Sequence, residues 1–386
     1  MKFHPSKIYP NGRHLIFLSI VWIVLQVLLL WQNGIVTGLE AEKYITQARY
    51  FLNHGKLASN NYYLYSTQIF LIAAVIKLHL GFPVIIGIQL VLSLYAVLMF
   101  YKMGLRFLDN NLLAALATLF FILNIPYQTY NSHLFTESIF YSLSIIYSSH
   151  LLLQEKFSLG TLLWMGSLLF LLCVTRPTGI LFFAATACYL FFRFLHQLTT
   201  FQKVLIVGSC IVVFLFIINA MLGAGGSLDF MLPFRKENII CGVNTVDYSG
   251  IVEMKEGNSL QGILYYLTYN HDQFFRLAKL KTFAFFGMMR TYYSVWHNIF
   301  LAIFFYPFYL LSLIGFWKKM RQRDVSLVYI ITIFFLYWVT TLLTCDDWHN
   351  RFILTVTPFI FLSGFAAFSL GASDVEADAK YNTTRQ

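Results

Sequence analysis

Residues 14–31 read HLIFLSIVWIVLQVLLLW, a run without Asp, Glu, Lys or Arg. About 20 apolar residues in a helix cross the hydrocarbon core of a bilayer, so this run predicts a membrane-spanning helix. No small-x-small cleavage pattern follows it, and we expect a retained first span rather than a removed signal sequence. Nine further apolar runs resemble it, which predicts about ten spans. The predicted spans are residues 14–31, 83–101, 112–125, 137–153, 160–175, 178–194, 203–222, 298–316, 325–343 and 352–370.

The composition of the whole chain agrees with this interpretation. Of the 386 residues, 58% are hydrophobic and 11% are charged, whereas a soluble domain carries about 25% charged residues. So few charges cannot cover a water-facing surface, which excludes a cytosolic enzyme, a disordered protein and a coiled coil. The net charge is +10, but the basic residues cluster in short loops between apolar runs. We therefore expect membrane lipids as surroundings and no nucleic acid as a partner.

The basic loops also predict the orientation of the chain. Lys2, Lys7 and Arg13 precede the first span and place the N-terminus in the cytoplasm by the positive-inside rule. The loops after the second, fourth, sixth and eighth spans are basic too, and the eighth is followed by KKMRQR at 318–323. We expect one polytopic all-α domain over residues 1–372 and a disordered cytoplasmic tail over 373–386.

The segment Ile69–Leu80 does not fit this scheme as a span. It is short, contains Lys77 and His79, and would invert every later loop if it crossed the membrane. We therefore predict a re-entrant or interfacial helix in the first outer loop. The predicted outer loops are residues 32–82, 126–136, 175–179, 223–297 and 345–351.

The first outer loop contains a sequence with helical amphipathicity, LEAEKYITQARYFLNHG at 39–55. At about 100° per residue, its apolar residues form one arc and its polar residues, including Gln47, form the opposite arc. Glu40 lies at the edge of the apolar arc beside Tyr44. Partial burial raises the basicity of a carboxylate, which suits a general base. The alternative is that Glu40 and Glu42 are only first-turn acids that favour the helix N-terminus.

In this loop and in several later segments the chain resembles the GT-C superfamily of polyprenyl-phosphate-sugar-dependent glycosyltransferases. It is similar to bacterial relatives of the protein O-mannosyltransferases and of the lipid A aminoarabinose transferase. The resemblance covers about residues 14–370. Where the family usually has Asp-Glu, this chain has Glu40-Ala41, and the family's His-Pro-Pro step reads Leu64-Tyr65-Ser66. The matching features are Glu40, Tyr44, Ala48 and Gly55 in the first outer loop, the FTESIF run at 135–140, the TRPTG turn at 175–179, and Arg351 with Pro358 in the last span.

The resemblance implies an inverting transfer of a sugar from a polyprenyl-phosphate donor to a glycan, lipid or protein acceptor on the extracytoplasmic face of an inner membrane. It implies Glu40 as the base that accepts the proton of the acceptor hydroxyl. Cations are needed to hold the phosphate that leaves. The residues expected to bind that phosphate are Arg176, Arg351, Lys279, Lys281 and Arg290. The residues expected to contact substrate are Glu137, His133, Tyr44, Asp346, Asp347 and His349.

Each of these roles has a simpler alternative. Glu137 could bind the acceptor, or it could contact a metal together with His133, which lies four residues earlier on the same predicted helical face. The simpler alternative is that Glu137 has no role in the site and stabilises the first turn of a helix that Thr136 caps. The alternative for Arg176 is that its side chain extends to lipid headgroups. The alternative for Arg351 is that the nearby acids do no more than neutralise its charge. The basic and aromatic stretch 274–298 could be an interfacial helix beside the phosphate or an ordinary aromatic belt. A divalent metal is left open, and no other cofactor is required.

The five cysteines show no zinc spacing. Cys241 and Cys345 fall in two outer loops, so a disulfide between them is conceivable, but we expect them to remain unpaired.

Two other functions remain as alternatives. A transporter or flippase of lipid-linked sugars would have charges buried within its spans and broken helices in corresponding positions of two halves. A polysaccharide polymerase or ligase would share the lipid donor and have an Arg-rich large outer loop.

Overall fold

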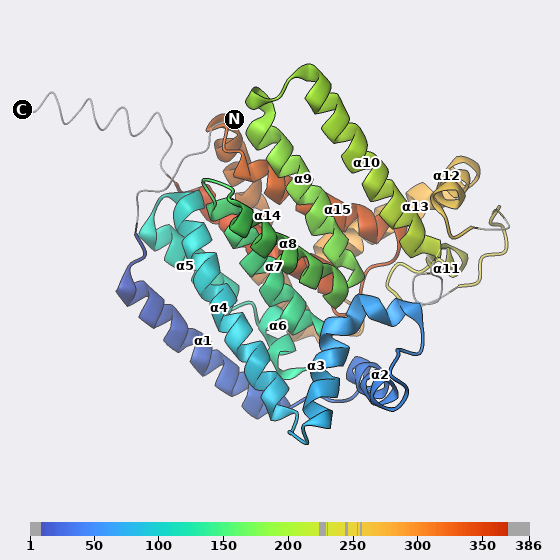
Figure 1. The fold of residues 1–386 in the computed structure, drawn as a ribbon, viewed down its shortest axis with the longest axis horizontal. Coiled ribbons are helices and arrows are strands. Elements are labelled where there is room, and N and C mark those ends of the chain that lie inside the picture. Colours follow the sequence, from blue (N-terminus) through green and yellow to red (C-terminus); the bar gives the residue numbers. More distant parts are fainter. Residues whose placement is uncertain are drawn as a thin grey trace, which may run out of the picture.

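Long apolar helices lie alongside one another through most of the molecule (Figure 1). The computed structural model describes residues 9–223, 229, 231–243, 246–252, 254 and 257–369. These residues form helices and connecting turns, with only isolated β-bridges between them. The predicted tail, residues 373–386, lies outside the described residues.

Each of the ten predicted spans folds as a helix. These helices are α1 (Gly12–Asn33), α4 (Pro83–Leu108), α5 (Asn111–Ile122), α7 (Thr136–Leu153), α8 (Leu159–Thr175), α9 (Ile180–Phe194), α10 (Thr200–Gly223), α14 (Val295–Arg321), α15 (Ser326–Leu343) and α16 (Arg351–Ala366). The connections contain α2 (Glu40–His54), η1 (Asn60–Tyr65), α3 (Ser66–Lys77), α6 (Ile125–Gln128), η2 (Thr129–Ser132), η3 (Pro177–Gly179), η4 (Leu195–Gln197), α11 (Leu232–Arg235), α12 (Leu260–Tyr269) and α13 (His271–Gly287).

Six helical segments in the described part of the chain are long and apolar enough to cross a membrane. They are α1, α4, η3 with α9, α10, α14 and α15. A seventh would be α5 followed by α6 and η2, two arms that meet at 61°. The helices α8 and α16 are apolar but have only 17 and 16 residues. The chain is therefore an all-helical, multi-pass membrane protein, and the total of ten spans remains a prediction.

The centre of the bundle is formed by α7, which is buried along nearly its whole length and packs against α4 and α8. Close packing elsewhere depends on small residues. On α14, a Cβ added to Gly315 would lie 1.8 Å from the carbonyl oxygen of Ser363 on α16, so only glycine permits this approach.

A network of buried amides holds the short helices α6 and η2 in place. The Gln26 amide on α1 donates to Gln128 at 3.0 Å, and the Asn131 amide donates to Gln128 at 3.2 Å and to Ser93 on α4 at 3.0 Å. The Ser138 hydroxyl on α7 donates to Asn131 at 2.7 Å. Because buried polar groups are costly without partners, this network fixes the second outer loop against three helices.

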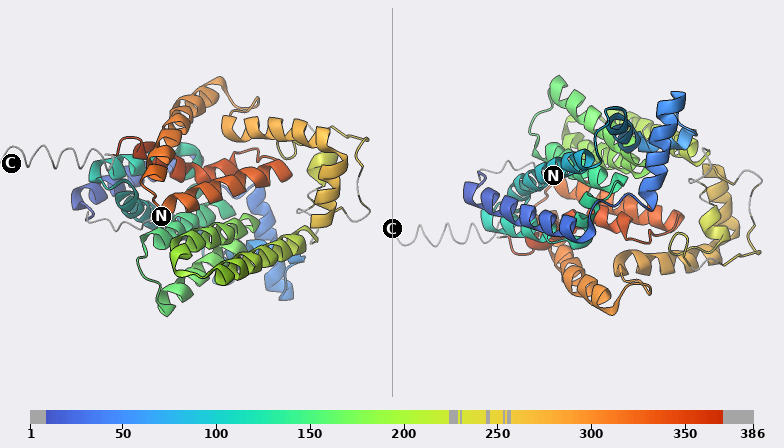
Figure 2. Two further views of the ribbon diagram at one scale, coloured as in Figure 1. Left: turned by 90° about the horizontal axis from the view of Figure 1, so that it is seen from above. Right: turned by 90° about the horizontal axis from the view of Figure 1, so that it is seen from below.

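The loops predicted for the outer side gather at one end of the bundle. Val36 in the first loop bridges to His133 in the second, and the Ser66 hydroxyl reaches the carbonyl of Val174 beside the third at 3.5 Å. Ile240 in the large loop bridges to Asp346 in the last. Figures 1 and 2 show α2 and α3 at the same end as α11, α12 and α13. A site built from several of these loops is therefore geometrically available.

The two helices of the first outer loop have the expected forms. Ala41, Tyr44, Ile45 and Ala48 of α2 are buried, which confirms the predicted apolar face. The prediction is wrong for Gln47, which is buried because its Oε1 accepts a hydrogen bond from the backbone of Ala58. α3 has 12 residues, a length of about 18 Å, which is too short to cross a hydrocarbon core of about 30 Å.

Cys241 and Cys345 form a disulfide, so the expectation of unpaired thiols is wrong. The pairing follows from backbone contacts on both sides: the N–H of Cys241 donates to the carbonyl of Asp346 at 2.8 Å, and the N–H of Asp346 donates to the carbonyl of Ile239 at 2.8 Å. The bond ties the large outer loop to the segment immediately before α16.

Removing this disulfide is expected to destabilise the protein. The cysteines lie 104 residues apart, and a bond that closes a long loop stabilises by about 2–4 kcal/mol. Cys241→Ser with Cys345→Ser should lower the thermal unfolding midpoint in detergent, and reductant should bring the wild type to the same midpoint. Cys188→Ser, at an exposed free thiol, is the control. An unfolding midpoint that changes neither with reductant nor with the double substitution contradicts this expectation.

Candidate active site

An ionic cluster occupies the end of the bundle where the outer loops meet. It joins α2, α7, the turn between α8 and α9, and the last outer loop with α16. The ionic cluster consists of Glu40, Glu137, Arg176, Asp347 and Arg351. All five were predicted as site residues, and the structure brings them together, although their roles remain predictions.

Arg351, the first residue of α16, is the centre of the ionic cluster. Its Nη1 pairs with Glu40 and, at 2.6 Å, with Oε1 of Glu137. Its Nη2 lies 2.6 Å from Oδ2 of Asp347. The guanidinium side chain is only 11% exposed. A cation this buried is tolerated because three carboxylates compensate its charge.

The loop before α16 fixes the position of Arg351. Asn350 has a φ of 60°, a left-handed conformation that Asn adopts more readily than most residues, and its amide donates to the carbonyl of Met288 at 2.7 Å. Asp347 accepts a hydrogen bond from the N–H of His349 at 2.9 Å. Burial alone would raise the pKa of Asp347, but the guanidinium of Arg351 outweighs it and lowers that pKa below its ordinary value. Asp347 is therefore a charged partner that holds Arg351.

Glu137 joins the two arginines. Its Oε1 lies 2.6 Å from Nη1 of Arg176 and 2.6 Å from Nη1 of Arg351, and its side chain is completely buried. Arg176 reaches it because the chain reverses tightly in the TRPTG turn. A Cβ added to Gly179 would lie 2.3 Å from the carbonyl oxygen of Leu172, so the turn requires glycine. The carboxylate of Glu137 thus holds both guanidinium groups rather than facing solvent.

Glu40 is the most accessible acid of the ionic cluster, with 27% of its side chain exposed. The Tyr44 hydroxyl donates to its Oε1 at 3.2 Å, and Nζ of Lys43 lies 3.8 Å from the same oxygen. Burial, reinforced by the charge of Glu40, raises the pKa of Tyr44, so the hydroxyl remains a donor. With Lys43, three cations balance the three carboxylates. Glu40 is therefore the carboxylate of the cluster that a substrate hydroxyl can best reach.

The backbone immediately before Glu40 is strained. Leu39 has φ 57° and ψ −125°, a conformation that residues with a Cβ rarely adopt. Such strain is kept where the surroundings enforce it, and it is often found at functional sites. Here it sets the start of α2, and with it the position of Glu40.

A cavity of about 300 Å³ opens on one side of the ionic cluster, and we call it the Arg176 pocket. Its walls are mainly apolar and come from α9, α10, α15 and the large outer loop. Arg176 is the only cation among the described residues that line it. They are Tyr65, Arg176, Pro177, Thr178, Ile180, Leu181, Ile218, Leu222, Asp229, Pro233, Cys241, Thr340, Thr344, Cys345 and Phe352.

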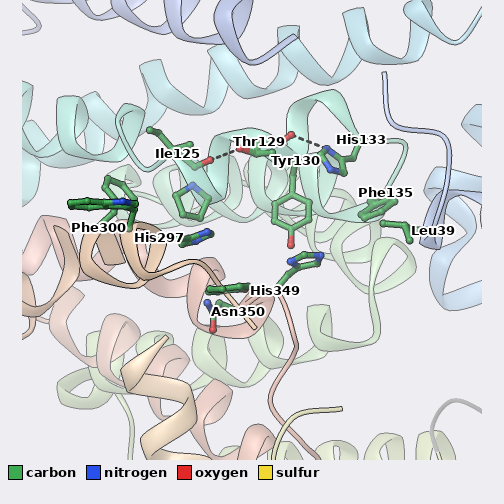
Figure 3. A pocket seen from close by; sticks show the side chains of 13 residues that line it. Leu39, Ile125, Thr129, Tyr130, His133, Phe135, His297, Phe300, His349 and Asn350 are labelled. Carbon is green, nitrogen blue, oxygen red and sulfur yellow. Dashed lines mark hydrogen bonds between the residues drawn. The ribbon is translucent and has the colours of Figure 1, made fainter. Parts of the chain in front are cut away.

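A second cavity, of about 510 Å³, opens on the other side, and we call it the histidine pocket. Figure 3 shows the Tyr130 hydroxyl directed toward His349, with His133 and His297 on either side. The pocket is lined by Leu39, Ile125, Pro126, Thr129, Tyr130, His133, Phe135, Tyr293, Trp296, His297, Phe300, His349 and Asn350.

The first turn of α16 separates the two cavities. Asn350 lines the histidine pocket, Arg351 belongs to the ionic cluster, and Phe352 lines the Arg176 pocket. Leu39, next to Glu40, also lines the histidine pocket. Both cavities are therefore lined by sequence neighbours of the ionic cluster, and its member Arg176 itself lines one of them.

The other predicted phosphate ligands are engaged elsewhere. The stretch 274–298 is not one helix, because α13 ends at Gly287 and α14 begins at Val295. Lys281 is buried and donates to the carbonyls of Leu342, at 3.2 Å, and Thr344 at the end of α15. Burial lowers the pKa of Lys281 to about 7, and Lys279 is exposed on α13.

Arg290 and Asp346 form a second, fully buried ion pair, with Nη2 of Arg290 2.5 Å from Oδ2 of Asp346. Burial raises the pKa of Asp346 to about 6, although Arg290 acts in the opposite direction. Arg290 also donates to the carbonyl of Asp347 at 3.3 Å. This pair therefore supports the loop that positions Arg351 and has no donors directed at either pocket.

The prediction that His133 and Glu137 share a helical face is wrong. α7 begins at Thr136, and His133 lies before it in extended backbone, where its Nδ1 bonds the carbonyl of Thr129 at 2.9 Å. Among the described residues, no group of three or more His, Cys, Asp or Glu is arranged to hold a metal ion. The carboxylates of the ionic cluster are paired with guanidinium groups, which does not fit a divalent cation.

Sequence reasoning missed Lys43, which lies beside the ionic cluster, and several residues of both cavities. In the sequence, Lys43 was one of several polar residues on the exposed arc of the predicted helix, with nothing to distinguish it. Tyr65 was noted because it departs from the family's His-Pro-Pro step, and no role in the site was predicted for it. Tyr130 lies in η2, and Trp296 and His297 lie in the first turn of α14, far away in the sequence. Their one signal in the sequence is a pair of aromatic and histidine clusters, PYQTYNSH at 126–133 and YYSVWHN at 292–298.

Comparison of the chain with protein-family models and with curated proteins gives no match.

Proposed function

We propose that the protein is a membrane glycosyltransferase of the GT-C type, which transfers a sugar from a polyprenyl-phosphate donor to an acceptor with inversion. The observation that carries this proposal is the position of the ionic cluster beside two cavities, one of which is lined by Arg176 and the other by uncharged aromatic, imidazole and apolar side chains. Two cavities whose linings include the sequence neighbours of Glu40 and Arg351 suit a reaction between two bound substrates at the ionic cluster.

The Arg176 pocket is the proposed donor site. Apolar side chains of α9 and α10 would hold the first isoprenoid units, and the guanidinium of Arg176 would hold the phosphate. In the described part of the chain Arg176 forms an ion pair with Glu137 through Nη1, and a guanidinium carries five N–H donors. Donors therefore remain for a phosphate oxygen without loss of the existing ion pair.

The proposed chemistry takes place at Glu40. The oxygen of an acceptor hydroxyl attacks the anomeric carbon, and Glu40 takes the hydroxyl proton. The bond from the anomeric carbon to the phosphate oxygen breaks, and its electron pair leaves with the polyprenyl phosphate. Arg176 offsets the negative charge that develops there. Arg351 holds Glu40 in position through their ion pair.

The outer location of the site is also part of the proposal. Its loops lie opposite the basic loops, which the positive-inside rule places in the cytoplasm. The Cys241–Cys345 disulfide lies beside the site, and disulfides persist in oxidising compartments such as the periplasm or cell exterior. Both observations support a site on the extracytoplasmic face.

The donor site is tested by Arg176→Ala. Loss of a charge-assisted contact with phosphate should weaken the binding of polyprenyl phosphate by about 10- to 100-fold. The measurement is an equilibrium titration of the protein in nanodiscs. Arg49→Ala removes an exposed arginine of α2 and should not change the affinity. An unchanged affinity in Arg176→Ala would refute the phosphate role.

A further inference from the structure

The histidine pocket differs in chemistry from the Arg176 pocket. The residues that line it include neither a carboxylate nor a lysine or arginine. They provide imidazoles, phenols, an indole, a hydroxyl and an amide, together with the apolar side chains of Leu39, Ile125, Pro126, Phe135 and Phe300. Its volume of about 510 Å³ lies within the usual range of small-molecule sites, about 300–1,000 Å³.

Burial favours the neutral form of two histidines that line the pocket. Burial lowers the pKa of His133 and of His349 below the ordinary value for imidazole. The hydrogen bond between Nδ1 of His133 and the carbonyl of Thr129 leaves Nε2 as an acceptor. An anionic headgroup would therefore find no cation in this pocket, in contrast to the Arg176 pocket.

Aromatic surfaces are available beside these polar groups. Trp296 is 80% exposed, and Tyr293 stacks on His297 with ring centroids 4.3 Å apart. A sugar ring presents C–H groups on its faces, which pack against aromatic rings, and hydroxyls at its edge, which both donate and accept hydrogen bonds. Neutral imidazole, phenol and hydroxyl groups also do both.

We infer that the histidine pocket is the acceptor site and that it binds a neutral saccharide, such as the end of a short glycan. This inference rests on the proposed transfer reaction, and it names the acceptor class that the reaction itself leaves open. Leu39 and Asn350 line the pocket and immediately precede Glu40 and Arg351. A saccharide in the pocket would therefore place a hydroxyl next to the proposed base.

The test is a saturation-transfer NMR titration of the full-length protein in nanodiscs with a panel of neutral methyl disaccharides of gluco, galacto and manno configuration. At least one should bind saturably. Trp296→Ala should weaken that binding by about 10-fold, which corresponds to about 1.4 kcal/mol, because the ring of Trp296 would lose its contact with the sugar. His297→Leu should weaken it as well. Trp31→Ala, at another exposed tryptophan (85%), is the matched control and should have no effect.

Three results would overturn the inference. No disaccharide binds, or the affinity for the disaccharide is the same in Trp296→Ala, His297→Leu and the wild type, or polyprenyl phosphate displaces the disaccharide in the Arg176→Ala protein. The same samples are titrated with polyprenyl phosphate. If disaccharide binding fails while donor binding still depends on Arg176, the acceptor class is wrong and the proposed transferase stands. If the affinity for polyprenyl phosphate is also unchanged in Arg176→Ala, both the inference and the proposed function are wrong.

Discussion

Replacing Glu40 by glutamine is expected to abolish sugar transfer while the protein remains folded and continues to bind its donor. Glutamine has the shape of Glu40 and can still accept the hydrogen bond from Tyr44, but it cannot take the proton of the acceptor hydroxyl. Removing a general base costs about 10²- to 10⁴-fold in rate. The measurement is the turnover of a reconstituted sample given a polyprenyl-phosphate sugar and a glycan acceptor.

Stability should change little in this variant. Glu40 is 27% exposed, and ion pairs that reach solvent contribute about 1 kcal/mol or less. Arg351 keeps Glu137 and Asp347 as partners. Glu42→Gln, an exposed acid in the same helical turn, is the control and should turn over normally. Near-normal transfer by Glu40→Gln would eliminate Glu40 as the base.

Replacing Glu137 by alanine is expected to have the largest effect on stability. The carboxylate is completely buried and is shared by Arg176 and Arg351. Without this carboxylate, Arg176 and Arg351 lose the negative charge that they share, and their two guanidinium groups repel each other. Breaking a buried ion pair by removing one partner costs about 3–5 kcal/mol. The thermal unfolding midpoint in detergent should fall, and the yield of monodisperse protein should fall with it.

The control for Glu137 is Glu155→Ala, an exposed acid in the loop after α7. It should leave the midpoint unchanged. A second variant, Glu137→Gln, keeps the volume of the side chain and removes only its charge. If Glu137→Gln unfolds at the wild-type temperature, the ionic cluster contributes little to the fold.

The helices were predictable from the sequence because their signals are local. An uninterrupted apolar run predicts a membrane helix wherever it occurs, and the period of the apolar residues in 39–55 predicted both α2 and its buried face. Gln47 escaped this pattern because its amide is satisfied by Ala58, eleven residues away. Such a contact depends on how the loop folds back and not on the helical period.

The assembly of the site could be predicted only in part. The distribution of charge identified the arginines and acids of the outer loops, but their pairing depends on contacts such as Glu40 with Arg351, which lie 311 residues apart. Lys281 and Arg290 carry the same charge as Arg176, and only tertiary packing assigns them to the end of α15 and to Asp346. The disulfide and the histidine pocket likewise arise where separate loops meet.

The identity of the lipid that co-purifies with the protein tests the proposed function most directly. The protein is isolated from its native membrane, and the bound lipids are extracted and analysed by mass spectrometry, with Arg176→Ala prepared in parallel. The wild type is expected to carry a polyprenyl phosphate or its sugar-loaded form, and Arg176→Ala is expected to have lost it. A wild-type protein that carries only the bulk phospholipids of its membrane, in the same proportions as Arg176→Ala, would contradict the proposal.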